Sequence, residues 1–189
     1  MEGNLQWTVK YLRRFNPNAL TIIGIIPQAL FFYFMLNQQF MAAAFMIILS
    51  CIDMFDGMIA RATNRVTRFG AFLDSTVDRL SDFILIAGFY FAGLISLNLF
   101  LTLFVFSYLV SYVRSRAELA SNGTIKFDVG LVERSERVIY LFIVLLLEII
   151  WPNATVFGGD LTPKLILILI LLSGYTLLQR IIAAYQKLD

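Results

Sequence analysis

The chain has 189 residues, of which 59% are apolar and only 15% are charged. A typical soluble domain is about 45–50% apolar and about 25% charged, so this composition excludes a soluble protein and predicts one that lies mostly in lipid. One cysteine and no histidine exclude an internal disulfide framework, a Ser-His-Asp triad and a zinc site built on histidine. Any chemistry must therefore use carboxylates, hydroxyls, Lys, Arg or metal ions.

The start of the chain has the pattern of an interfacial helix. Over residues 4–15, a helix would place apolar side chains such as Trp7 and Phe15 on one half and basic ones such as Lys10 and Arg13 on the other. A helix with this partition lies on an anionic membrane surface. We therefore expect an interfacial amphipathic helix over residues 1–17, followed by a transmembrane domain over residues 18–189; an unstructured cytosolic tail is the alternative.

The rest of the chain divides into apolar stretches of the length that a bilayer-spanning helix needs, roughly 20 residues. Polar triplets at 37–39 and 96–98 separate neighbouring stretches, and Pro163 is suited to the first turn of the last one. The predicted spans are residues 18–36, 40–61, 70–95, 98–118, 137–153 and 163–185. The expected fold class is an all-α integral membrane protein with six transmembrane helices.

The basic residues predict how these spans are oriented, because loops rich in Lys and Arg stay in the cytoplasm. Fourteen of the fifteen Lys and Arg residues lie on the same predicted side, and Lys164 alone lies on the other. We therefore expect a multi-pass protein of the cell membrane with both termini and the active site at the cytoplasmic face.

Four aspartates lie in the second and third predicted spans, where ionisable groups are costly and usually functional. Asp53 and Asp56 are three residues apart, and Asp74 and Asp78 are four apart, so each pair shares one helical face. Their distance in sequence from Arg61 places the first pair about 8–12 Å below the cytoplasmic edge, and the second pair at a matching depth. Four converging carboxylates need cations, and a ligand set of oxygens alone favours Mg²⁺ or Mn²⁺, expected as a pair of ions.

Two glycines accompany the acids. Gly57 directly follows the second aspartate, and Gly70 lies one turn before the third. A glycine inside a helix costs up to about 1 kcal/mol relative to alanine, so we expect a ligand to approach the backbone closely. Close packing between helices, which the small residues Ala60 and Ala71 would also permit, is the alternative.

The segment from Asp53 to Asp78 resembles the signature DxxDGxxAR(x8)GxxxDxxxD of the CDP-alcohol phosphotransferase family, and all eight fixed positions match over 26 residues. The stretch NPNALT at 16–21 is also similar to the start of that family's first span. The resemblance implies an enzyme in which an acceptor hydroxyl attacks the lipid-linked phosphate of a CDP-lipid and releases CMP.

The resemblance also implies a role for each motif residue. The first three aspartates, Asp53, Asp56 and Asp74, would hold the metal ions, and Asp78 would deprotonate the acceptor alcohol and add a fourth carboxylate to the metal site. The small residues would make room for the cytidine nucleotide. The implied nucleotide-binding residues are Asn18, Thr21, Asp56, Gly57, Ala60, Arg61 and Gly70.

A second resemblance concerns the acceptor. Residues 111–118 (SYVRSRAE) and 130–137 (GLVERSER) look like the branch of the family that uses inositol phosphate, the phosphatidylinositol-phosphate and archaetidylinositol-phosphate synthases. A phosphorylated acceptor needs cationic side chains to bind it. The candidates for acceptor binding are Arg116, Lys126, Arg134 and Arg137. A basic loop that contacts only lipid phosphates is the alternative.

The chain is therefore predicted to be a metal-dependent CDP-alcohol phosphotransferase of phospholipid biosynthesis. The expected donor is CDP-diacylglycerol or CDP-archaeol, and the expected acceptor is inositol phosphate, with glycerol 3-phosphate as the alternative. Intramembrane acids also mark ion paths, so a cation transporter is a distant alternative, although all four acids lie near one face. The expected partners are the two substrates, membrane lipids and, because the family commonly forms homodimers, a second copy of the chain, with no nucleic acid.

Overall fold

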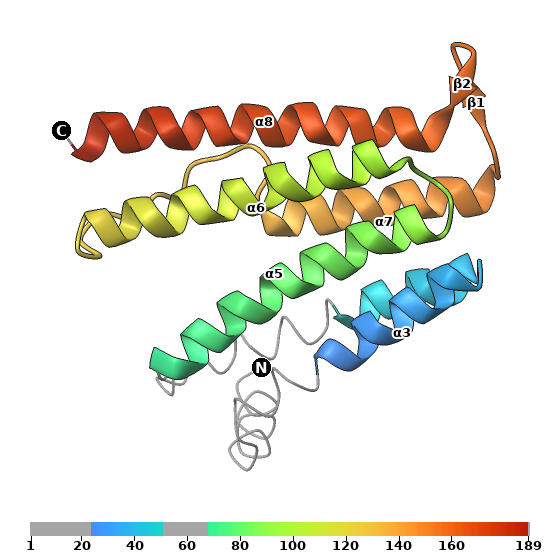
Figure 1. Cartoon of the computed structure of the whole chain (residues 1–189), viewed down its shortest axis with the longest axis horizontal. Helices are drawn as coiled ribbons and strands as arrows, with labels where there is room; N and C mark the ends of the chain where they lie inside the picture. The colour runs from blue at the N-terminus through green and yellow to red at the C-terminus, as the bar shows by residue number, and fades with distance from the viewer. Residues whose placement is uncertain (1–23, 51–67, 189) are drawn as a thin grey trace, which may run out of the picture. The chain divides into compact units, whose positions relative to one another are not determined.

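The computed structural model describes residues 24–50 and 68–188, and apart from loops and one small β-hairpin these residues are helical (Figure 1). The predicted interfacial helix over residues 1–17 lies outside the described residues, as does part of each of the first two predicted spans. The chain divides into two compact units, Met1–Leu85 and Ile86–Asp189. Helix α5 (Arg68–Phe91) begins in the first unit and ends in the second.

In the first unit, a tight turn joins two apolar helices, α3 (Ile25–Leu36) and Phe40–Ser50. The turn falls on the polar triplet at 37–39, as the sequence predicts. The side chain of Asn37 donates a hydrogen bond to the carbonyl oxygen of Tyr33 at 2.8 Å, which caps α3. Apolar side chains of both helices are buried, namely Phe31, Met35, Ala43, Ala44 and Ile47.

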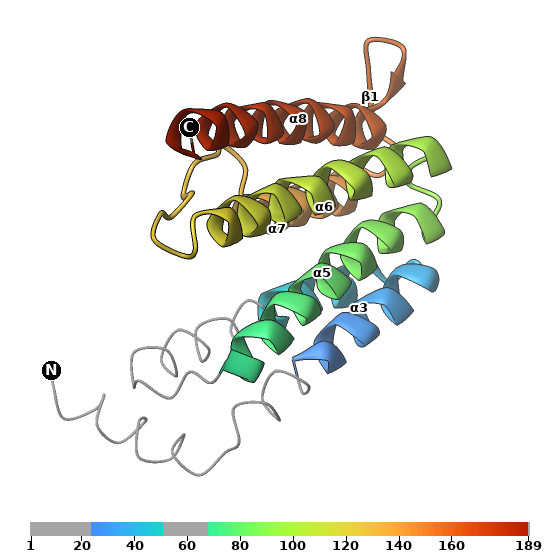
Figure 2. The ribbon, with the colours of Figure 1, turned by 60° about the vertical axis from the view of Figure 1, so that its left-hand side comes forward.

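The second unit contains three helices, α6 (Leu97–Ala120), α7 (Arg134–Ile150) and α8 (Leu161–Leu188). Helices α6 and α7 each pack against α8 (Figure 2). Helix α6 begins one residue before its predicted span. The Ser96 hydroxyl caps this end of the helix, because it accepts a hydrogen bond from the backbone N–H of Leu99 at 3.4 Å. Helix α7 begins three residues before the predicted start of its span and ends three residues before the predicted end.

The side chains of α8 are arranged for a lipid environment. Its buried residues include four polar ones, Thr162, Ser173, Thr176 and Arg180, among the apolar Ile166, Leu169, Ile170 and Ala183. Its exposed face is apolar, with Leu167, Leu171, Leu178 and Ile182 open to the surroundings, Leu171 being 66% exposed. Polar groups inside and apolar groups outside are expected where the solvent is lipid. Among the described helices, α6 and α8 are long and apolar enough to cross a bilayer.

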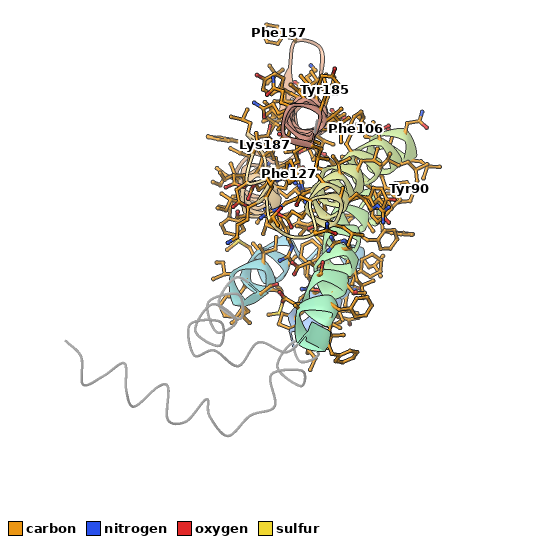
Figure 3. The ribbon with its side chains drawn as sticks, turned by 90° about the vertical axis from the view of Figure 1, so that its left-hand side faces the viewer. Tyr90, Phe106, Phe127, Phe157, Tyr185 and Lys187 are labelled. Atoms are coloured by element: carbon orange, nitrogen blue, oxygen red, sulfur yellow. The ribbon has the colours of Figure 1, made fainter. Side chains whose placement is uncertain are left out.

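A β-hairpin between α7 and α8 departs from the all-α prediction. Strands β1 (Thr155–Val156) and β2 (Gly159–Asp160) pair antiparallel. Phe157 and Gly158 form the turn with φ of 48° and 73°, the left-handed backbone that two-residue hairpins require. Phe157 is 99% exposed at the tip (Figure 3). Strands of two residues are too short to produce an alternating pattern, so the sequence does not reveal them.

A buried carboxylate closes the base of this hairpin. Glu148, near the end of α7, is only 8% exposed. Its carboxylate accepts hydrogen bonds from the Thr162 hydroxyl at 2.6 Å and from the backbone N–H of Asn153 at 3.1 Å. These bonds join the end of α7 to the start of α8, so α7 and α8 meet at the end that carries the hairpin.

Candidate active site

Two of the four predicted acids lie in the first half of α5. Asp74 and Asp78 are one helical turn apart, and residues four apart share a face of the helix. Asp74 is exposed and Asp78 is half-buried. Gly70 lies one turn before Asp74 in the same row. The structure therefore places this part of the motif on a single helical face, as its spacing predicts.

A short chain of polar side chains links α5 to the other helices of the first unit, one turn beyond Asp78. The buried Ser81 hydroxyl donates a hydrogen bond to Gln28 Oε1 on α3 at 2.7 Å. Gln28 Nε2 in turn donates to the Ser50 hydroxyl at 3.5 Å. Ser50 is the last described residue of the helix Phe40–Ser50, so this chain of hydrogen bonds holds that part of the helix close to the acidic half of α5.

The rest of the motif follows Ser50 in the sequence but lies outside the described residues. This holds for the metal-binding candidates Asp53 and Asp56. Six of the seven proposed nucleotide-binding residues also lie outside the described residues, namely Asn18, Thr21, Asp56, Gly57, Ala60 and Arg61. Asp53 and Asp56 come three and six residues after Ser50.

The donor set on α5 fits a hard cation. Carboxylate oxygens are the ligands that Mg²⁺ and Mn²⁺ prefer, and Asp74 and Asp78 present two carboxylates one turn apart on an accessible face. Within residues 24–50 and 68–188, no three acidic, Cys or His side chains gather closely enough to hold a metal by themselves. A site made with α5 would therefore need ligands from elsewhere, and Asp53 and Asp56 are the sequence's candidates.

The four basic candidates for acceptor binding differ in exposure. Arg134 and Arg137 lie one turn apart at the start of α7, the first half-buried and the second only 3% exposed. Arg116, near the end of α6, and Lys126, in the loop before α7, are exposed. The structure thus brings Arg134 and Arg137 together, and it does not by itself gather all four cations into one cluster.

A carboxylate at the start of α7 interacts with two arginine side chains, one from each of the neighbouring helices α6 and α8. Glu133 precedes the first residue of α7, and its Oε1 accepts a hydrogen bond from Arg180 Nη2 at 2.9 Å. Arg114 Nη1 of α6 lies 3.7 Å from the same oxygen. Arg114 also pairs with Glu118 and with Asp128. Charged side chains of α6, α7 and α8 therefore meet at one point.

Arg180 has the largest part in this network. Its side chain is 4% exposed, and it donates hydrogen bonds to the carbonyl oxygens of Val129 at 2.8 Å and Val110 at 2.7 Å. Arg114 and Arg137 lie close enough to interact with it electrostatically. This proximity places Arg137 near the same network.

The sequence does not predict this network, because Arg180 counts only among the basic residues of the predicted cytoplasmic side and Glu133 only as part of the stretch 130–137. The sequence does carry one signal for Arg180, because it is the only charged residue between Lys164 and Lys187 in the last span. A lone charge inside an apolar helix usually has a partner. Which partner it has depends on contacts with residues 47 or more positions away, and the sequence does not supply these.

A family model described as CDP-alcohol phosphatidyltransferase matches residues 14–183, which is most of the chain. The chain belongs to the CDP-alcohol phosphatidyltransferase family. The acidic motif at 53–78 and all the described helices, except the last five residues of α8, fall within the matched residues. The predicted enzyme class is therefore confirmed: the chain is a CDP-alcohol phosphotransferase.

Several members of this family resemble the chain over most of its length. It is 42% identical over 176 residues to the archaetidylinositol phosphate synthase of Pyrococcus horikoshii, covering 92% of this chain and 86% of the relative. It is 26% identical to the crystal structure of Mycobacterium tuberculosis phosphatidylinositol phosphate synthase with CDP-DAG bound, with a TM-score of 0.76 and coverage of 94% and 93%. The structure of the same M. tuberculosis enzyme in complex with manganese and citrate matches with a TM-score of 0.77, 27% identity and coverage of 96% and 88%.

Proposed function

We propose that this CDP-alcohol phosphotransferase transfers the lipid-linked phosphate of a CDP-lipid to a hydroxyl of inositol phosphate and releases CMP. The observation that carries this proposal is the match to an archaetidylinositol phosphate synthase over 92% of the chain. The solved relative with CDP-DAG bound supports a CDP-lipid as the donor. Membership in a family of phosphotransferases also favours this reaction over cation transport.

In the proposed reaction, an inositol hydroxyl oxygen attacks the phosphorus that carries the lipid. The bond from that phosphorus to the oxygen shared with the cytidine-bearing phosphate breaks, and CMP leaves with this oxygen. The proton of the hydroxyl passes to the carboxylate of Asp78, which lies half-buried on α5. A carboxylate in this position acts as a general base, and the product is a phosphodiester.

We further propose that Asp53, Asp56 and Asp74 hold Mg²⁺ or Mn²⁺, as a pair of ions, beside Asp78. The manganese-bound relative and the two carboxylates on α5 support a metal at this site. Such ions would supply positive charge that offsets the charge developing on the leaving group. The nucleotide would lie against Asn18, Thr21, Asp56, Gly57, Ala60, Arg61 and Gly70.

Substitutions of the two arginines at the start of α7 test the proposed binding of the acceptor. If Arg134 and Arg137 bind the phosphate of inositol phosphate, with Arg116 and Lys126 contributing from the surface, Arg134→Gln or Arg137→Gln should raise the KM for inositol 1-phosphate. A charge-assisted hydrogen bond is worth roughly 1.5–3 kcal/mol, so the rise should be about 10- to 100-fold. The KM for the CDP-lipid should change little. Steady-state rates of CMP release in detergent measure both constants.

Lys164→Gln is the control, because Lys164 lies at the opposite end of α8 and its amine donates to the Gly159 carbonyl oxygen at 3.1 Å. Its KM values should match those of the unchanged protein. An unchanged KM for inositol 1-phosphate in both arginine variants would reject the acceptor clamp. Faster transfer to glycerol 3-phosphate than to inositol 1-phosphate would make the alternative acceptor correct.

We also propose that two copies of the chain form a homodimer. A separate proposal concerns orientation: the end of the second unit that carries Arg114, Arg134, Arg137 and Arg180 faces the cytoplasm. The support for orientation is the distribution of charge, because basic residues favour the cytoplasmic side. In a Cys51→Ser background, Ala120→Cys and Thr155→Cys place one exposed thiol at each end of the unit. A membrane-impermeant maleimide should label the first thiol only in inside-out vesicles and the second only in right-side-out vesicles. The reverse result would invert the topology.

A further inference from the structure

Every residue of the segment Val129–Glu133, which leads into α7, contacts one short stretch of α8. Arg180 binds the Val129 carbonyl oxygen at 2.8 Å and the Glu133 carboxylate at 2.9 Å. Between these ends, the backbone N–H of Leu131 donates to Gln179 Oε1 at 3.1 Å, and that of Val132 donates to the Thr176 hydroxyl at 3.0 Å. We call this set of contacts the α8 anchor.

Gly130 completes the anchor by its lack of a side chain. A Cβ atom at this position would lie 2.6 Å from Thr176 Cγ2 and 3.3 Å from Arg180 Nε. The backbone there has φ of +149°, a conformation that residues with a Cβ atom rarely adopt. The segment can therefore approach α8 this closely only with glycine at 130.

The anchor determines where α7 begins. Its last residue, Glu133, precedes α7 directly, and the Glu136 carboxylate accepts a hydrogen bond from the Glu133 backbone N–H at 3.0 Å. Arg134 and Arg137 follow within the first turn and a half of the helix. A shift of the segment along α8 would move both guanidinium groups with it.

We propose that the α8 anchor positions Arg134 and Arg137 for the acceptor, so that Gly130, Glu133 and Thr176 are positioning residues for acceptor specificity. This inference rests on the proposed function of those two arginines. Apolar packing alone could hold the segment to α8 without burying a guanidinium group to 4% exposure. Buried polar networks restrict a segment to one arrangement more strictly than apolar contacts do, which is what a binding site requires.

The first test changes the hydroxyl of Thr176. Thr176→Val keeps the shape of the side chain and removes the acceptor for the Val132 N–H, whereas Thr176→Ser keeps the hydroxyl. We expect Thr176→Val to raise the KM for inositol 1-phosphate by about 2- to 10-fold, in line with the net value of one hydrogen bond, with the KM for the CDP-lipid unchanged. Gln179→Met, which removes a more accessible acceptor, should have a smaller effect of the same kind and provides a variant that folds readily.

The second test uses the close contact at Gly130. Gly130→Ala should push the segment off α8 and raise the acceptor KM by more than Thr176→Val does. The double variant Gly130→Ala/Thr176→Ser removes the methyl group that the new Cβ would meet and keeps the hydroxyl. It should recover part of the lost acceptor affinity, and the rest should stay lost because of the backbone conformation.

The third test compares two carboxylates that both contact Arg114. Glu133→Gln removes the ion pair with Arg180 and should raise the acceptor KM about tenfold or more. Glu118→Gln removes a carboxylate that lies 3.1 Å from Arg114 but does not touch the segment. Its acceptor KM should rise much less than that of Glu133→Gln.

The proposal is overturned if Thr176→Val and Glu133→Gln lower only the thermal stability, with both KM values unchanged, because the anchor would then be purely structural. It is also overturned if the two KM values rise equally. A failure of the proposed clamp is distinguishable, since it would show as a normal acceptor KM in Arg134→Gln and Arg137→Gln themselves. A failure of the anchor would leave those two variants impaired and the anchor variants normal.

Discussion

Asp78→Asn is expected to lower turnover by about 10²–10⁴ while largely preserving the binding of CDP-lipid. Loss of a general base costs this much in rate, because an amide cannot accept the proton of the acceptor hydroxyl. Contacts to the nucleotide would stay in place, since the proposed ones lie on other residues. Turnover is measured as CMP release at saturating acceptor, and donor binding by titration of a CDP-lipid in detergent.

Asp82→Asn is the matched control for this variant. Asp82 is the next acid in the same row of α5, one turn beyond Asp78, and it lies outside the motif and is 8% exposed. Its turnover should stay within a few-fold of the unchanged protein. A loss of donor binding in proportion to turnover in Asp78→Asn would make Asp78 primarily a metal ligand, and the proposed base would be wrong.

Asp74→Asn is expected to reduce transfer by more than about a hundredfold at a metal concentration that saturates the unchanged protein. A neutral amide weakens a site whose affinity for a hard cation comes from carboxylate charge. Part of the activity should return at a much higher concentration of Mn²⁺, because the amide oxygen still coordinates weakly. The measurement is CMP release as a function of metal concentration.

Asp160, an exposed carboxylate in the hairpin, provides a control in which the net charge changes by the same amount. Asp160→Asn should show the metal dependence of the unchanged protein. EDTA should abolish transfer in both proteins, and full activity in the presence of EDTA would contradict a metal-dependent reaction. Full activity of Asp74→Asn at low metal would instead remove Asp74 from the site and leave the metal to other ligands.

Much of the described fold follows from local sequence features. The end of α3 at the polar triplet 37–39 and the start of α6 at Ser96 are both predicted, because turns and caps depend on residues within a few positions. The spans that became α5 to α8 were predicted from apolar length alone, with ends displaced by only a few residues. The hairpin at 155–160 was not predicted, because its two-residue strands contain too few positions to form a pattern.

The acidic site was predictable to a similar degree. The spacing of Asp74 and Asp78 alone places them on one face, and the motif indicates their chemistry. The sequence also supplied the basic residues of the acceptor candidates, but it could not tell a buried Arg137 from an exposed Arg116. Burial depends on which helices pack together, and that is a property of the whole unit.

The sequence by itself determined the lipid environment, the helical class, the acidic motif and the family, since each depends on composition or on short-range spacing. Only the tertiary structure decided that Arg180 binds Glu133 and two backbone carbonyl groups, and that Gly130 lies against Thr176. These contacts join residues 46 to 70 positions apart. A guanidinium group can pair with any carboxylate or carbonyl group that packing brings near, so its partners are known only once α6, α7 and α8 have been brought together.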